Sequence, residues 1–208
     1  MRYRQAEALR YMRAPATDKA TANLLDLVYL KLRNEVQARS VIRRFTCQVE
    51  EGGVLLDCGI RFHSQSLARH LRGCQEVLLL AATLGSRVDI AIRRLTLGSV
   101  TEGAAAQAVA AAVIEGYCDE VQSAYATELH QKPRFSPGYG DWPLEEQEQI
   151  FRLLDCPKQI GLTLTEGLMM VPSKSVTAII GLTAEETCVQ QKCKTCVNTA
   201  CPYREGNI

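Results

Sequence analysis

Hydrophobic and polar positions alternate along the chain with two different periods, and these periods predict its helices and strands. Residues 18–39 predict an amphipathic helix, because apolar side chains recur at helical spacing from Leu24 to Leu32. Residues 104–130 are rich in alanine and contain no proline, so they predict the longest helix. Residues 76–83 form an almost continuous apolar run, which is typical of a strand buried on both faces.

The remaining elements are shorter. Residues 41–50 and 54–62 predict a hairpin, and residues 66–74 predict a short helix with Ser66 as its N-cap. Residues 144–154 predict a helix that is opened by a proline and has acids in its first turn. Residues 162–182 predict a last strand region. Strands and helices do not alternate regularly. We therefore expect an α+β fold, with mixed helices and a twisted, mainly antiparallel sheet in a single domain.

Composition and charge narrow the class of protein. The 208 residues suffice for one domain, and a net charge of +1 gives no basic footprint for nucleic acid. No segment is apolar over the length that spans a bilayer, and the first residues are charged from Arg2 onward, unlike a secretory signal. We therefore expect a cytoplasmic protein.

Nine cysteines are informative in such a protein, because cytoplasmic thiols stay reduced. Five lie among apolar residues and are expected to fill core positions: Cys47, Cys58, Cys74, Cys118 and Cys156. The other four crowd into the last part of the chain: Cys188, Cys193, Cys196 and Cys201. The sequence thus divides into a domain over 1–187 and a Cys-rich tail over 188–208.

The four tail thiols have a spacing that suits a metal. Thiolates this close together can hold an iron–sulfur cluster or zinc. The x4 and x2 spacings match plant-type ferredoxins, although the fourth ligand of those proteins lies farther along the chain. Three interpretations stay open: an iron–sulfur cluster, which the sequence favours, zinc, or thiols without a metal.

A loop with unusual composition, Arg-Phe-Ser-Pro-Gly-Tyr-Gly at 134–140, separates two predicted helices. Proline fixes one φ angle, and the glycines permit backbone shapes that other residues resist. Such a loop can turn backbone groups towards a ligand and hold Tyr139 rigidly. The residues alone favour the alternative, a structural turn around one packed tyrosine.

Several motifs occur in a fixed order around this loop. They are Ile-Glu-Gly-Tyr at 114–117, Arg-x-x-x-Gly-Tyr at 134–139, Leu-Leu-Asp at 153–155, Ile-Gly-Leu-Thr-Leu-Thr-Glu at 160–166, Met-Val-Pro at 170–172 and Ser-Val at 175–176. From about residue 104 to 181 this series resembles the activation domain of cobalamin-dependent methionine synthase, which binds S-adenosylmethionine. The first hundred residues resemble that family only vaguely.

The resemblance implies roles for individual residues. Arg134, Phe135 and Gly138 would lie in the S-adenosylmethionine site. Tyr139 would occupy the catalytic position, where the methyl donor meets the corrin. Glu115 would offer a carboxylate to the ammonium group or ribose hydroxyls of the donor, against the alternative of an ordinary acid on a helix surface. Less distinctive positions would support the site wall: Glu166, Lys174 and Ser175.

The chain departs from the family pattern at two places. The family has proline after Gly-Tyr, whereas this chain has Gly140 followed by Asp141 and Trp142. The connection between the long helix and Arg134 is also short. Both departures concern the geometry of the donor site.

The implied activity is the reactivation of cobalamin by reductive methylation with S-adenosylmethionine. The chain has no Asp-x-His-x-x-Gly motif for cobalamin, so we expect the corrinoid on a partner protein, in a split methionine synthase or a related methyltransferase. The electron would come from a ferredoxin, a flavodoxin or a cluster on the tail. The alternatives are a non-catalytic S-adenosylmethionine-binding module, an electron-transfer adaptor and a structural domain with a zinc-stabilised tail.

Overall fold

The computed structural model of the protein describes residues 3–184. Its helices are α1 (Gln5–Tyr11), α2 (Lys19–Leu32), α3 (Gln65–His70), α4 (Ser86–Gly98), α5 (Val100–Ala124), the short 3-10 helix η1 (Leu144–Glu146), α6 (Gln147–Leu154) and α7 (Cys156–Ile160). Its strands are β1 (Arg39–Glu50), β2 (Gly53–Leu56), β3 (Arg61–His63), β4 (Glu76–Thr83), β5 (His130–Gln131), β6 (Thr163–Leu164), β7 (Met170–Val171) and β8 (Ser175–Thr183). Cys188, Cys193, Cys196 and Cys201 lie outside the described residues, and the metal prediction for them stays a prediction.

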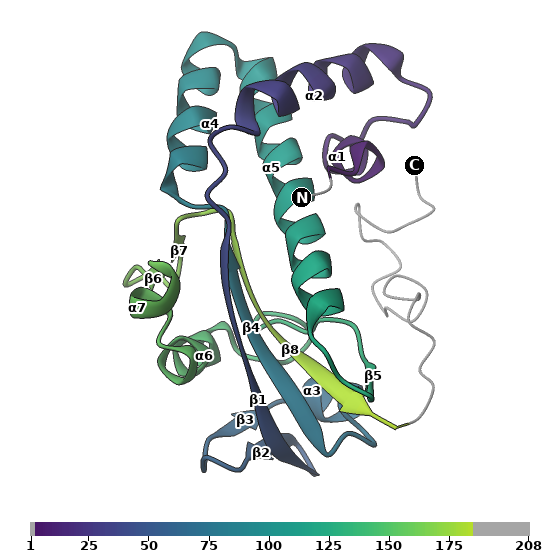
Figure 1. Cartoon of the computed structure of the whole chain (residues 1–208), viewed down its shortest axis with the longest axis vertical. Coiled ribbons are helices and arrows are strands. Elements are labelled where there is room, and N and C mark those ends of the chain that lie inside the picture. The colour runs from purple at the N-terminus through teal and green to yellow at the C-terminus, as the bar shows by residue number, and fades with distance from the viewer. Residues whose placement is uncertain (1–2, 185–208) are drawn as a thin grey trace.

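Six strands form one sheet in the order β3-β2-β1-β4-β8-β5, and every neighbouring pair is antiparallel (Figure 1). β4 lies between β1 and β8, so that Leu79 is paired with Arg43 on one side and with Ile179 on the other. β6 and β7 form a separate small hairpin. The prediction of a single α+β domain with a mainly antiparallel sheet is confirmed.

β4 divides the hydrophobic interior into two cores, because successive side chains of a strand point to opposite faces. Leu78 and Leu80 join the core that contains α1, α2, α4 and α5. Val77 and Leu79 join the core that contains α3, α6 and α7. All four side chains are fully buried. Burial on both faces explains why this segment is apolar throughout rather than alternating.

The long helix α5 positions the site. It begins at Val100 and ends at Ala124, four and six residues earlier than the predicted 104–130. Ser99 sets its start, because its hydroxyl accepts a bond of 3.3 Å from the amide of Glu102, and Tyr125 leaves the helical conformation. Figure 1 shows α5 running from the end where α2 and α4 pack around it down along the sheet.

Other boundaries differ from the sequence prediction. The predicted helix 18–39 ends at Leu32, and β1 begins at Arg39. The second run of the predicted hairpin is divided into β2 and β3 by a turn that carries Cys58, which is exposed, so its expected place in the core was wrong. The other four cysteines within the described residues are buried, as expected.

Ser64, not Ser66, caps α3. Its hydroxyl oxygen accepts a bond of 2.9 Å from the amide of Leu67, whereas Ser66 lies inside the helix. A serine two residues away satisfies the same composition rule, so only the start of the helix decides which one acts as the cap.

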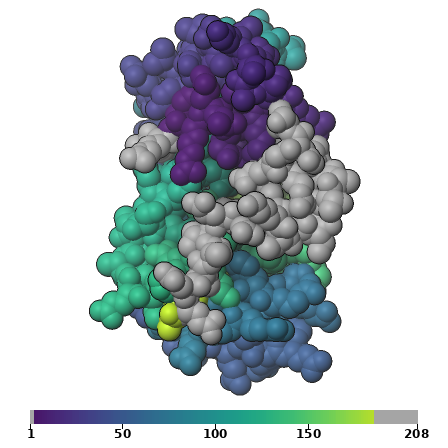
Figure 2. Space-filling model, turned by 90° about the vertical axis from the view of Figure 1, so that its right-hand side faces the viewer, coloured from purple at the N-terminus to yellow at the C-terminus, as the bar shows by residue number. Residues whose placement is uncertain are grey.

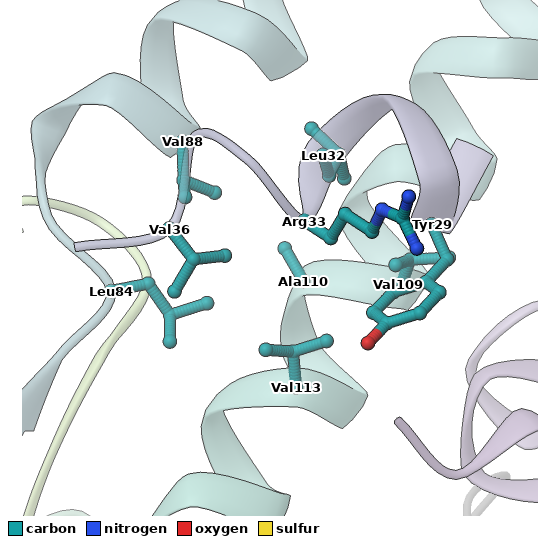
Figure 3. A pocket seen from close by; sticks show the side chains of 9 residues that line it. All are labelled: Tyr29, Leu32, Arg33, Val36, Leu84, Val88, Val109, Ala110 and Val113. Atoms are coloured by element: carbon teal, nitrogen blue, oxygen red, sulfur yellow. The ribbon is translucent and has the colours of Figure 1, made fainter. Parts of the chain in front are cut away.

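A small apolar hollow lies among α2, α4 and α5, lined by residues that include Tyr29, Val88, Val109 and Val113 (Figure 3). It holds about 10 Å³ of free space, about enough for one water molecule, and is therefore too small for a nucleoside. Within residues 3–184, no helix combines the length and the apolar composition needed to cross a bilayer.

Candidate functional site

Arg134 is the buried centre of an ion-pair network beside α5. Its Nη2 lies 2.7 Å from Glu115 Oε2 and 2.8 Å from Asp119 Oδ1, and its Nη1 donates to Gln122 Oε1 at 3.1 Å. The side chain of Arg134 is only 6% exposed. Burial acts most strongly and would lower the pKa of Arg134, but the surrounding groups, led by the Glu115 carboxylate, together raise it. The guanidinium therefore stays charged in the interior.

α5 supplies all three acceptors of this network. Glu115, Asp119 and Gln122 are four and three residues apart, so they lie on one face of the helix. The structure brings Glu115 and Arg134 together, as the family resemblance implied. Asp119 and Gln122 were missed, although their spacing from Glu115 on a single helix was the signal that could have found them.

The N-terminal segment closes the network from another side. Arg4, which precedes α1, places Nη2 3.0 Å from Asp119 Oδ2, so that Asp119 bridges two guanidinium groups. Tyr11 ends α1, and burial followed by the Glu115 carboxylate raises the pKa of Tyr11 to about 12. Figure 2 shows the N-terminal residues directly above the surface of α5. The sequence did not predict this contribution of α1.

The loop between β5 and η1 is fixed by its own backbone. Phe135 exchanges two hydrogen bonds with Ile179 of β8, at 2.9 and 2.8 Å, which adds one residue pair to the sheet. The amide of Gly138 donates to the Trp142 carbonyl at 2.8 Å, and the amide of Tyr139 donates to the Ser136 carbonyl at 3.0 Å. Gly138 has a φ of 88°, which favours glycine. These bonds hold the loop in shape.

Aromatic rings support the loop from below. The Phe135 ring lies 5.0 Å from the His70 ring and 6.1 Å from the Trp142 ring. Trp142 is 1% exposed, and its indole N–H donates to Glu146 Oε2 at 2.7 Å. The loop is thus fastened into the core that contains α3 and α6, while Arg134 at its start reaches α5.

Tyr139 is the side chain that this loop presents to the outside. It is 56% exposed, and its ring meets Phe135 edge-on at a centroid distance of 5.8 Å. Partial burial, followed by the Glu115 carboxylate, raises the pKa of Tyr139, whereas Arg134 opposes this shift. Tyr139 therefore remains a neutral phenol at physiological pH, next to the carboxylate of Glu115.

The three predicted supports of the site wall lie elsewhere. Glu166 is exposed in the loop between β6 and β7. Lys174 and Ser175 lie at the start of β8, where Ser175 pairs with Thr83, and burial lowers the pKa of Lys174. Phe135 pairs with Ile179, four residues farther along β8, which is about 13 Å of strand. The structure does not bring these three residues to the Arg134 network.

Residues 3–184 contain no group of three or more His, Cys, Asp or Glu side chains that could hold a metal ion. The three histidines lie on different elements: His63 on β3, His70 on α3 and His130 on β5. The candidate site consists of two carboxylates around one buried cation, near an exposed tyrosine on a fixed loop.

Fold and candidate site therefore define a class of protein, an α+β domain with a fixed, tyrosine-bearing loop joined to its antiparallel sheet. Residues 103–190 match the sequence profile of the family described as "Vitamin B12 dependent methionine synthase, activation domain". This segment contains most of α5, the loop and β8, and the resemblance recognised in the sequence is confirmed for it.

The fold has a known counterpart that extends beyond the matched segment. A crystal structure of the MetH reactivation domain bound to AdoHcy superposes with a TM-score of 0.61 at 17% sequence identity, covering 88% of this chain and 67% of that chain. The likeness of fold thus includes much of the first hundred residues, where sequence resemblance is vague. A comparison with curated protein sequences gives no match.

Proposed function

We propose that this chain binds S-adenosylmethionine and reactivates a methionine synthase-type corrinoid protein by reductive methylation. The observation that carries the proposal is the network of Glu115, Arg134 and Asp119 near the exposed Tyr139, in the segment that matches the activation-domain family. The similar fold of a reactivation domain bound to AdoHcy supports it, because AdoHcy is the demethylated form of the same ligand.

The site offers groups of both signs of charge to a ligand that itself carries both. S-adenosylmethionine carries a sulfonium and an ammonium against one carboxylate, and is therefore a net cation. The site places two carboxylates around one buried guanidinium, with a second arginine, Arg4, 55% exposed at the rim. Glu115 is 36% exposed, so its carboxylate faces both Arg134 and the outside. An ammonium group or a pair of ribose hydroxyls would bind there by charge-assisted hydrogen bonds.

Each residue then has a task of binding or positioning. Arg134 holds the carboxylates of Glu115 and Asp119 in place and offsets the repulsion between them. Tyr139, fixed by the loop, orients the donor and presents its methyl group to the corrinoid. Methyl transfer needs the reacting atoms in line, and a tyrosine held by a fixed loop would help to align them.

The corrinoid is the substrate in this proposal. Its cobalt takes one electron from a reductant and then accepts the methyl group of S-adenosylmethionine, whose carbon–sulfur bond breaks to leave S-adenosylhomocysteine. We propose that the corrinoid is carried by a separate protein and that the electron comes from a ferredoxin, a flavodoxin or a cluster on the Cys-rich tail. The protein contributes orientation and electrostatics, and the corrinoid contributes the reactive metal.

Ligand titration tests the binding step. We expect isothermal titration calorimetry with S-adenosylmethionine to show saturable binding, weakened about ten-fold or more in Glu115→Gln, because one charge-assisted bond is lost. Glu102→Gln is the matched control: Glu102 is also on α5 and forms a salt bridge of 2.8 Å to Lys31, but at the opposite end of the helix. Its affinity should equal that of the unmodified chain.

A turnover assay tests the reaction. Free cob(II)alamin, a strong reductant and S-adenosylmethionine should yield methylcobalamin and S-adenosylhomocysteine in equal amounts. Binding without either product would favour the non-catalytic binding module instead. Absence of binding, with and without cobalamin, would exclude the activation-domain function altogether.

A further inference from the structure

The short helix α3 is held at both ends by the segment that contains the binding loop. One contact is made by Asp141, just after the loop, at the start of α3. The other is made by Lys132 and Pro133, just before the loop, at the end of α3. α3 lies outside residues 103–190, the segment that carries the family signature.

The contact at the start of α3 is made by the Asp141 carboxylate. Asp141 Oδ1 accepts from the Ser64 hydroxyl at 2.6 Å and from the Ser66 amide at 2.9 Å, and Oδ2 accepts from the Gln65 amide at 2.9 Å. These bonds, of which the one from Ser64 has the largest effect, lower the pKa of Asp141. The Ser64 hydroxyl also accepts the capping bond from Leu67, so it links the helix to the loop.

Gly140 brings the loop close enough for these bonds. It has a φ of 59°, and a Cβ built on it would lie 2.7 Å from both Cβ and Oγ of Ser66. Only glycine fits between the loop and α3 at this point. Gly140 and Asp141 are the residues at which this chain departs from the family pattern of proline after Gly-Tyr.

The contact at the end of α3 involves main-chain carbonyls. Lys132 Nζ donates to the carbonyls of His70 at 3.0 Å and Arg72 at 2.7 Å. His70 Nε2 in turn donates to the Pro133 carbonyl at 2.9 Å, beneath the Phe135 ring. The loop, residues 134–140, is therefore attached to α3 on both of its sides.

We infer that α3 holds the binding loop in place and that Asp141 is a positioning residue. Through its bonds to Ser64, Gln65 and Ser66, Asp141 fixes the position of Tyr139. This inference rests on the proposed function, because it assigns the bonds a role in ligand affinity.

The test variant is Asp141→Asn, which keeps size and removes one acceptor. Its amide nitrogen would face the Gln65 amide, donor against donor. We expect the dissociation constant for S-adenosylmethionine to rise about ten-fold, because bonds to a charged acceptor are lost from the loop and not from the ligand. Fluorescence of Trp142, the one tryptophan in the sequence, reports on the same loop without any ligand, and its emission should shift.

Asp89→Asn is the matched control. Asp89 fastens another loop in the same manner, by accepting from the Ser173 amide at 2.8 Å and the Ser173 hydroxyl at 2.7 Å. This anchor lies at the start of β8, away from the Arg134 network. The control should lower the melting temperature by a similar amount but leave the dissociation constant and the Trp142 emission unchanged.

A second variant keeps the inference testable if Asp141→Asn folds poorly. Ser64→Ala removes the hydroxyl that donates to Asp141, and should also raise the dissociation constant. Combining the two changes should add little beyond the larger single effect, because both break the same link. If both variants lose melting temperature but bind like the unmodified chain, Asp141 is merely structural. If the unmodified chain itself does not bind, the proposed function fails, whereas the Trp142 emission still tests the anchoring.

Discussion

Arg134 places a positive charge in the interior, where two carboxylates and an amide oxygen receive it. The guanidinium is buried whereas both carboxylates are about one-third exposed, so the loss of its bonds costs more than breaking an ion pair at the surface. The residue that best marks the family motif is thus also a structural centre, and its removal changes more than the binding site.

We expect Arg134→Ala to lower the free energy of unfolding by about 2–3 kcal/mol in urea denaturation, because the buried guanidinium and its bonds to two carboxylates and an amide oxygen are lost. Arg87→Ala is the control: Arg87 pairs with Glu35 at 2.8 Å but is 53% exposed, and should cost only about 0–1 kcal/mol. Similar values for the two variants would show that the Arg134 side chain is not buried in solution. The large expected effect is also the reason for probing ligand affinity at Glu115.

His70 gives the protein a pH dependence at the residue scale. Burial, and to a lesser extent the charge of Lys132, lower the pKa of His70 from its ordinary value of 6.5, while the bond to Pro133 opposes this. The unfolded chain therefore binds a proton at a higher pH than the folded chain does. Stability should fall as the pH drops below about 6.5 towards the lowered value.

Urea midpoints of unfolding at pH 7.5 and 5.5 measure this effect. The loss of stability at pH 5.5 should be smaller in His70→Asn than in the unmodified chain, because the titrating group is gone. His63→Asn is a suitable comparison, since His63 is 69% exposed, and it should keep the full loss. An equal pH dependence in all three proteins would contradict the role of His70.

At the scale of elements, the contact of the loop with α3 depends on a residue without a side chain. Gly140→Ala should lower the melting temperature and weaken binding of S-adenosylmethionine, because its Cβ would overlap Ser66 at 2.7 Å. Gly59→Ala isolates the cost of the backbone conformation, since Gly59 has a φ of 84° with no atom within 4 Å of the added Cβ. Calorimetry of both variants should show lost affinity only for Gly140. Equal affinity would mean that the loop tolerates displacement from α3.

Elements with a uniform environment were the ones that the sequence predicted well. Residues 76–83 match β4 from end to end, because burial on both faces makes the segment apolar throughout. α4 was missed, since it exposes Ile90 and Leu97 while burying Val88 and Ile92, which blurs its apolar face. Helix ends depend on single caps, and several serines near a helix start satisfy the same rule. The pattern of hydrophobic and polar residues therefore cannot locate such helix ends to the residue.

At the scale of the whole molecule, the site joins parts that are distant in sequence. Glu115 and Arg134 could be predicted from the motifs of one segment. Arg4, 115 positions before Asp119, and Ser64, 77 positions before Asp141, could not, because no periodicity relates residues on different elements. Tertiary packing decides these contacts, and only the fold reveals them.

The division of the interior into two cores places the site at their junction. Arg134 reaches α5 on one side of the sheet, and Trp142 enters the core on the other. Phe135 crosses between them on the edge of the sheet, paired with Ile179.

The double attachment of the loop to α3 has a consequence for engineering. Residues 103–190 carry the recognisable motifs and would be the natural piece to graft or express alone. That piece lacks Ser64, His70 and Arg4, and its strand β8 would lose its neighbour β4. The segment with the recognisable motifs is therefore not a module that can be transplanted alone. A chimera that keeps these motifs must also inherit the part of the chain before residue 103, which contains the attachment points of the loop.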